Sequence, residues 1–212
     1  MDIESPQLML LLNWMSPAFP TGAYAYSHGL EWAIEDHQVK SKLDVEAWIT
    51  DLLTRGSGWN DAVLFAAECR DENVNEMALA LCSSRERYLE TTQLGAAFQI
   101  AASTFCIVAK SEAETAYPVI TARACKAMKI DPSHALLAFL QGFSNALISV
   151  AVRLVPLGQT SGLELMRDLM PVISTVAQRA QNSTLEDLGS CALMSDIAAM
   201  KHETQYSRIF RS

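Results

Sequence analysis

Residues 131–155, with the sequence DPSHALLAFLQGFSNALISVAVRLV, decide the fold. Asp131-Pro132-Ser133 is a helix start signal, because Asp and Ser cap helices and Pro is favoured in the first turn. The helix that follows, Ser133–Val155, has no charged residue from Ala135 to Val152 and is ended by Pro156-Leu157-Gly158. A helix this apolar is buried on most of its faces, so the stretch predicts a central helix surrounded by others.

The same stretch approaches the length of a membrane span. Five polar or small residues interrupt it, namely Gln141, Gly142, Ser144, Asn145 and Ser149. Polar side chains here would need partners inside lipid, so the core helix of a soluble bundle explains the stretch better. The apolar run Leu8–Leu12 is too short to span and lacks a basic flank, so no secretory signal is predicted. We therefore expect no membrane partner.

Helix signals continue on both sides of this segment. Ser41-Lys42-Leu43-Asp44 has capping-box spacing and precedes an apolar stripe at helical spacing, namely Val45, Trp48, Ile49, Leu52 and Leu53. Gly56-Ser57-Gly58 ends that helix. The other predicted helices are about Pro6–Met15, about Ala23–Asp36, one capped by Asn60 or Asp61, one or two between Val74 and Ala109, Thr115–Lys129, Ser161–Ala180 kinked at Pro171, a short one after Asn182, and Leu193–His202. With eight to ten helices and no strand, the prediction is an all-α helical bundle with a flexible C-terminal tail.

Composition favours one domain. The chain has 212 residues, of which 50% are hydrophobic and 19% charged, and its mean hydropathy of +0.12 excludes a disordered chain. It has no internal repeat and no linker, so residues 1–212 are predicted to form a single domain. Sixteen Lys and Arg against 24 Asp and Glu give a net charge of −8, which argues against a nucleic-acid partner. The five dispersed cysteines are typical of reduced thiols in a cytoplasmic protein, and they are Cys69, Cys82, Cys106, Cys125 and Cys191.

No motif for catalysis or tight metal binding is present. The sequence lacks the glycine loops that bind phosphates, the Gly-x-Ser-x-Gly elbow and the His-Glu-x-x-His pair. It also lacks Cys-x-x-Cys and His-x-His, and the neighbours His202 and Glu203 point about 100° apart on a helix, which suits one ion poorly. We therefore expect no enzyme, no catalytic residue, no cofactor and no metal site. A weak, transient metal contact by a histidine is the alternative.

Two irregular stretches carry the side chains that are typical of protein interfaces. Ser16–Glu31 reads SPAFPTGAYAYSHGLE, where Phe19, Tyr24 and Tyr26 offer aromatic area. A well-packed turn between core helices explains this stretch equally well. The tail, residues 203–212, combines Tyr206, Ile209 and Phe210 with Arg208 and Arg211, a composition of interface hot spots. This tail either docks on its own core or orders only against a partner.

At these stretches the sequence resembles the family of the urease accessory protein UreF. In Ser16–Glu31 the positions that match the family pattern are Pro17, Pro20, Gly22, Tyr26, Ser27, His28, Gly29, Leu30 and Glu31. Further matching segments are Glu90–Gly95, Tyr117–Val119, Arg153–Thr160 and Ser195–Ser212, with Thr92 where the family usually has Arg. The resemblance covers nearly the whole chain in the same order.

The resemblance implies an all-helical, dimeric protein without catalytic activity. UreF-like proteins bridge a second accessory protein, UreD (UreH in some organisms), and the GTPase UreG, and the assembly acts on apo-urease to insert nickel. The same resemblance implies that UreF controls the GTPase cycle or helps to pass nickel between partners. The missing phosphate loop agrees with leaving GTP hydrolysis to UreG, and the acidic surface suits a scaffold.

From the residues and the resemblance together we predict a set of partner-binding residues. They are Pro20, Gly22, Tyr24, Tyr26, Ser27, His28, Glu31, Arg153, Gln159, His202, Glu203, Gln205, Tyr206, Arg208, Phe210 and Arg211. Glu31 is expected to present a carboxylate to a basic group of a partner or to Ni²⁺ in transit, with a local cap or ion pair as the alternative. Arg153, on a helix predicted to be buried, should need a charged or carbonyl partner. Lining a passage or contacting a partner protein is the equal alternative for this residue.

Two rival hypotheses remain at this point. One is a generic helical protein-protein adaptor unrelated to urease, which would assemble with neither UreD/UreH nor UreG. The other is an enzyme with an unrecognised site, which would show turnover by the isolated chain.

Overall fold

The chain forms helices and no strand over residues 3–105, 114–189 and 191–211, which the computed structural model describes. The α-helices in this part are α1 (Ser5–Trp14), α2 (Leu30–Glu35), α3 (Lys42–Arg55), α4 (Ser57–Cys69), α5 (Asn75–Ala80), α6 (Arg85–Ala102), α7 (Tyr117–Ala127), α8 (Pro132–Leu154), α9 (Gly158–Gln181) and α10 (Leu193–His202). Two short 3-10 helices are η1 (Ala23–Ala25) and η2 (Leu185–Asp187). The predicted all-α bundle of eight to ten helices is confirmed.

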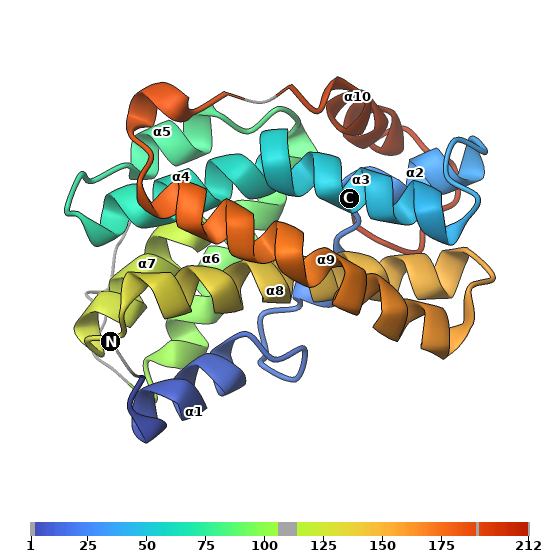
Figure 1. Ribbon diagram of the computed structural model, residues 1–212. Helices are drawn as coiled ribbons and strands as arrows, with labels where there is room; N and C mark the ends of the chain where they lie inside the picture. Colours follow the sequence, from blue (N-terminus) through green and yellow to red (C-terminus); the bar gives the residue numbers. More distant parts are fainter. Residues whose placement is uncertain (1–2, 106–113, 190, 212) are drawn as a thin grey trace.

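The apolar helix α8 lies in the middle of the bundle (Figure 1). It packs along α9 and also contacts α2, α3, α4 and α7. Leu136, Leu140 and Leu147 are fully buried in the core, whereas Gln141 is exposed. By length and composition α8 could cross a membrane, and 50% of its apolar window is buried inside the fold. Its contacts are those of a core helix, as the sequence predicts.

The predicted capping signals operate in the structure. Ser41 Oγ accepts the backbone N–H of Asp44, and Asp44 Oδ2 accepts the N–H of Ser41 at 2.9 Å, which completes the capping box of α3. Asp131 Oδ1 accepts the N–H of Ser133 at 2.9 Å at the start of α8. The apolar stripe of α3 faces the core, with four of its five residues buried, namely Val45, Ile49, Leu52 and Leu53.

The single helix predicted over Ala23–Asp36 is wrong. The chain makes only the short η1 and then α2, and Tyr26 between them has extended backbone. The cause is the backbone at His28 and Gly29, whose φ angles of 51° and 75° lie in the left-handed region. A right-handed helix cannot continue through these residues.

Other predicted boundaries shift without changing the architecture. Helix α4 begins at Ser57 rather than at a cap near Asn60, because Gly56 alone, with φ −113° and ψ −152°, separates it from α3. The segment from Val74 forms two helices, α5 and α6, and its predicted end at Ala109 lies outside the described residues. Pro171 lies inside the continuous helix α9.

Helix α10 packs against α2 and α6, two helices that are far from it in the sequence (Figure 1). Gly29 makes the close approach possible, because a Cβ there would lie 2.6 Å from the backbone nitrogen of Ala199 and 2.8 Å from the Cβ of Ala198. Its φ of 75° also favours glycine. This contact brings the N-terminal motif and the end of the chain together.

Candidate functional site

Three segments that are distant in sequence meet where α10 packs on α2 and α6. They are the loop 16–29 with the start of α2, the middle of α6, and residues 202–211. Tyr26 joins the first two, because it is buried and its hydroxyl donates to Gln93 Oε1 at 2.8 Å. Arg211 Nη1 donates to the same oxygen at 3.3 Å. Three of the segments on which the resemblance rests therefore form one structural unit.

A first buried cluster joins α6 to the loop and to α4. His28 Nε2 lies 2.9 Å from Glu90 Oε1, and its Nδ1 lies 3.1 Å from Ser57 Oγ. Arg87 bridges two carboxylates, at 3.1 Å from Glu90 and 2.5 Å from Asp61. The side chains of His28, Asp61, Arg87 and Glu90 are at least 88% buried. A buried Arg with two carboxylates is stable only when each charge keeps its partner.

The pKa values of this first cluster follow from burial and pairing. Burial raises the pKa of Asp61 above its ordinary value, although Arg87 opposes this. Burial would also raise the pKa of Glu90, but His28 and Arg87 together hold it below its ordinary value. Burial lowers the pKa of Arg87, but Asp61 and Glu90 outweigh burial and raise it. Pairing therefore outweighs burial at Glu90, whereas burial outweighs pairing at Asp61.

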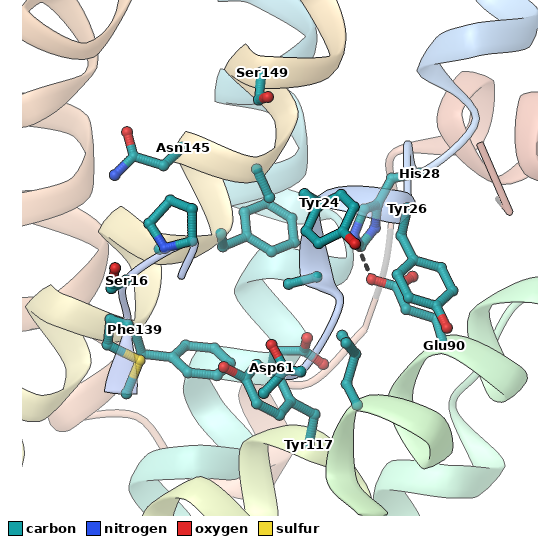
Figure 2. A pocket seen from close by; sticks show the side chains of 18 of the residues that line it. Ser16, Tyr24, Tyr26, His28, Asp61, Glu90, Tyr117, Phe139, Asn145 and Ser149 are labelled. Carbon is teal, nitrogen blue, oxygen red and sulfur yellow. Dashed lines mark ion pairs between the residues drawn. The ribbon is translucent and has the colours of Figure 1, made fainter. Parts of the chain in front are cut away.

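A cavity of about 100 Å³ lies beside the first cluster and is covered by the loop 16–28 (Figure 2). Six aromatic side chains are among the residues that line it, and its charged and polar side chains come from the loop, α4, α6 and α8. The labelled residues in Figure 2 that line it are Ser16, Tyr24, Tyr26, His28, Asp61, Glu90, Tyr117, Phe139, Asn145 and Ser149. Trp14 also lines this cavity, and its buried indole N–H has no hydrogen-bond partner among the described residues.

A second buried cluster lies between α2, α6 and α10. The ring of His202 is fully buried, with Nδ1 2.9 Å from Glu86 Oε2 and Nε2 3.0 Å from Glu31 Oε2. Glu86 also accepts from Arg208 Nη1 at 3.0 Å. Burial raises the pKa of Glu86, although His202 and Arg208 lower it. Glu31 therefore makes the kind of local contact that was the alternative reading, and its contact with a partner or with Ni²⁺ stays a prediction.

The tail docks on its own core over residues 203–211. Glu31 accepts the backbone N–H groups of Ile209 at 2.7 Å and Phe210 at 2.9 Å. The side chain of Phe210 is buried, and the N–H of Arg211 donates to the carbonyl of Ala25 at 2.7 Å. Of the two alternatives left open by the sequence, docking on the chain's own core is the one found. Ser212, the last residue of the predicted tail 203–212, lies outside the described residues.

The other predicted residues occupy several environments. Pro20, Tyr24 and Tyr206 are exposed. Glu203 accepts the N–H of Arg85 at 2.9 Å, and Gln205 donates to the carboxylate of Glu35. Both contacts fix the tail to the ends of α6 and α2.

Three predicted residues make local contacts or lie apart. Gly22 directly precedes η1 as its N-cap residue, and the buried Ser27 Oγ accepts the N–H of Glu31 at 3.3 Å. Gln159 is exposed in the first turn of α9 and takes no part in the two clusters.

The environment expected for Arg153 is wrong. Its side chain is exposed rather than buried, because this residue lies on the solvent side of the last turn of α8. Its guanidinium lies 6.0 Å from the ring centroid of Phe210. Arg153 therefore covers the docked tail by a cation–π contact instead of pairing with a buried charge.

Sequence reasoning missed Asp61, Glu86 and Arg87, which complete the two clusters. Asp61 was interpreted as a helix cap, and no pattern singled out the other two. The available signal was weak, because 85–87 reads Arg-Glu-Arg and such charge runs are usually solvated. Their burial depends on the packing of α10, which begins more than 100 residues later.

The two clusters fit structural pairing better than metal binding. Among residues 3–105, 114–189 and 191–211, no group of three or more His, Cys, Asp or Glu is arranged to hold a metal ion. Glu31 and Glu86 contact opposite ring nitrogens of His202, so the three groups do not converge on one point. The arrangement holds segments together and presents the exposed side chains of the tail.

Comparison with known proteins gives matches over the whole chain. The family model described as UreF matches residues 39–170. A urease accessory protein UreF of Mesorhizobium japonicum is 45% identical over 218 residues, covering 99% of this chain and 98% of that protein. One of Ruegeria pomeroyi is 43% identical and covers 97% of each chain. A urease accessory protein UreF 1 of Brucella anthropi is 42% identical, covering 97% of this chain and 94% of that protein.

Proposed function

The chain belongs to the UreF family of urease accessory proteins, and from this premise we propose that it bridges UreD/UreH and the GTPase UreG on apo-urease. In this assembly it would assist nickel insertion and modulate the GTPase cycle of UreG. We further propose that it works as a homodimer in the cytoplasm, is not an enzyme, and engages neither nucleic acid nor membrane. An adaptor unrelated to urease is no longer needed to explain the sequence.

The observation that carries the proposed partner role is the docked tail. Buried Phe210 anchors it, while Tyr206 is fully exposed and Ile209 is 72% exposed. On α10, which leads into the tail, Leu193, Met194 and Met200 are also at least half exposed. Exposed aromatic and aliphatic side chains on a firmly held backbone are the kind of anchors that protein partners bury. We assign this surface, the α10–tail surface, to UreD/UreH.

The test is co-purification of the full chain with UreD/UreH and UreG, followed by size-exclusion chromatography with light scattering. A stoichiometric complex of the three is expected, and the isolated chain should elute at twice its 23.3 kDa mass. A monomer that binds neither UreD/UreH nor UreG would contradict the proposal.

Two double variants locate the surface. Tyr206→Ala with Ile209→Ala should weaken UreD/UreH binding at least ~10-fold, because these side chains contribute contact area without holding the fold. Leu163→Ala with Met170→Ala on α9 is the matched control, since these residues are similarly exposed. Deleting Gln205–Ser212 should leave a folded helical dimer that no longer captures UreD/UreH. Retained capture by the deletion would exclude the tail as the binding element.

A further inference from the structure

The second cluster requires more protons than a neutral histidine supplies. Both ring nitrogens of His202 lie within 3.0 Å of carboxylate oxygens, one on Glu86 and one on Glu31. A neutral imidazole has one N–H donor and one lone pair. In the neutral form one nitrogen lone pair would face a carboxylate oxygen inside the protein, where such repulsion is poorly screened. Either the ring or one carboxyl group must therefore carry an additional proton.

The hydrogen bonds of the two carboxylates place that proton on the ring. Glu31 accepts two backbone N–H groups, from Ile209 and Phe210, in addition to its contact with His202. Glu86 accepts a charge-assisted hydrogen bond from Arg208. Hydrogen bonds to the ionised form and a neighbouring guanidinium both favour carboxylate over carboxylic acid. At Glu86 they act against burial, which raises the pKa of this carboxyl group. With Glu31 and Glu86 both ionised, the positive charges of Arg208 and of a doubly protonated His202 ring make the cluster neutral.

We propose that the buried imidazolium of His202 is a latch that holds the tail against the domain, and that loss of its proton releases the α10–tail surface. The carboxylate oxygens that contact the ring belong to the same two groups that bind Arg208, Ile209 and Phe210. Removing the proton leaves two carboxylates and one guanidinium, an unpaired negative charge at a buried site. The inference rests on the proposed function only in taking this surface as the partner-binding one.

The other charged groups around the latch are already engaged. Three charged groups on the packed elements each have a hydrogen bond to a group outside the cluster, and they are Glu35 on α2, Glu203 at the end of α10, and Arg211 in the tail. Further ionisable groups line a small cavity beside Ala199 on α10, and they are His28, Arg87, Glu90 and Asp196. His28, Arg87 and Glu90 form the first cluster, and Asp196 accepts from Ser83 at 2.7 Å.

The first measurement uses the wild-type chain alone. Nitrogen-15 NMR of the histidine rings reports the number of ring protons, and amide hydrogen exchange reports the protection of the Ile209 and Phe210 N–H groups. Between about pH 6 and about pH 10, His202 should begin doubly protonated. It should lose one proton at the same pH at which the two amides lose protection by ~10-fold or more, after correction for intrinsic exchange. A singly protonated His202 ring together with a protected tail would overturn the proposal. Amide protection that does not change when the ring loses its proton would also overturn it.

Two substitutions sharpen the test by changing the proton count. Glu86→Gln supplies a side-chain N–H for Nδ1 of a neutral His202 and keeps an oxygen for Arg208. The tail should then stay protected across the pH range. His202→Gln has one amide donor group in place of two ring N–H groups that point in opposite directions. The tail amides should therefore be unprotected from hydrogen exchange across the whole pH range. Protection in Glu86→Gln that falls with pH as in the wild type would contradict the latch.

A histidine control and a partner assay separate the two proposals. His37 is exposed, and His37→Asn should reproduce the wild-type profile, since Asn tolerates its φ of 61°. His202→Gln should also lose UreD/UreH capture in the co-purification assay. If the His202 ring and the tail titrate together but the wild type does not capture UreD/UreH, the latch stands and the partner assignment is refuted. If the wild type captures UreD/UreH while the His202 ring is neutral, the partner assignment stands and the latch is refuted.

Discussion

Glu31 accepts the backbone N–H of Phe210 at 2.9 Å, although 178 residues of sequence lie between them. Glu31 is the last residue of the N-terminal motif, and Phe210 is the buried anchor of the tail. The same carboxylate also contacts Ile209 and His202. The conformations of the two irregular segments are therefore coupled through one buried side chain, and a change in either should reach the other.

Replacing Glu31 by Ala should destabilise the fold strongly. The change leaves the N–H groups of Ile209 and Phe210 and a ring nitrogen of His202 without their acceptor. Removing one member of a buried charged pair typically costs about 3–5 kcal/mol. Urea unfolding at neutral pH measures the loss, and hydrogen exchange should show an unprotected tail. Glu35→Ala is the control, because Glu35 contacts the tail through Gln205 from an exposed position and should cost less than ~1 kcal/mol. Equal losses in the two variants would refute the central role of Glu31.

Glu90 should make stability depend on pH in the acidic range. The pKa of Glu90 in the folded chain is held below its ordinary value by His28 and Arg87, against the effect of burial. A lowered folded pKa means that ionised Glu90 stabilises the fold above its unfolded pKa, and that this contribution is lost as pH falls through the folded pKa. Glu90→Gln should lower the free energy of unfolding near neutral pH and reduce its acid dependence. Urea unfolding from neutral pH downwards measures both, and an unchanged slope would contradict the assignment.

Local signals predicted the helices well where the signal and the structure involve neighbouring residues. The Ser41–Asp44 capping box and the Asp131 cap need only residues two or three positions apart. The left-handed φ of His28 was not predictable, because a non-glycine residue adopts it only when tertiary contacts compensate. His28 is held on both ring nitrogens by Ser57 and Glu90.

The clusters were predictable only in part, for a related reason. His28, Glu31, His202 and Arg208 were identified from motifs, but their pairing with one another and with Glu86 and Glu90 was not, since no local pattern pairs residues across a chain. Glu86 and His202 are 116 positions apart. The exposure of Arg153 was missed because an apolar helix was taken as buried along its whole length, whereas the last turn of α8 reaches solvent.

Gly95 and Gly142 should respond oppositely to substitution by Ala. A Cβ at Gly95 would lie 2.0 Å from the carbonyl oxygen of Thr115, so α6 would have to move from the segment before α7. Overpacking of this kind costs about 1–3 kcal/mol or more. At Gly142 the nearest atoms, on Met15, lie at 3.5 Å, an ordinary contact. Ala there should stabilise α8 by about 0.5–1 kcal/mol. Thermal unfolding compares them, and similar shifts of the same sign would contradict the packing at Gly95.

Phe210→Ala should detach the tail while leaving the bundle folded. The ring is buried to 5% exposure and is covered by Arg153, yet it belongs to a segment that ends the chain. Loss of such a side chain therefore favours local release of the tail over global unfolding. We expect an unchanged helical circular-dichroism spectrum, loss of protection at the Ile209 amide, and loss of UreD/UreH capture although Tyr206 and Ile209 are intact. Phe210→Leu, which keeps an apolar side chain in the site, should retain most of the capture. Full capture by Phe210→Ala would mean that the partner binds the exposed side chains without needing the docked backbone.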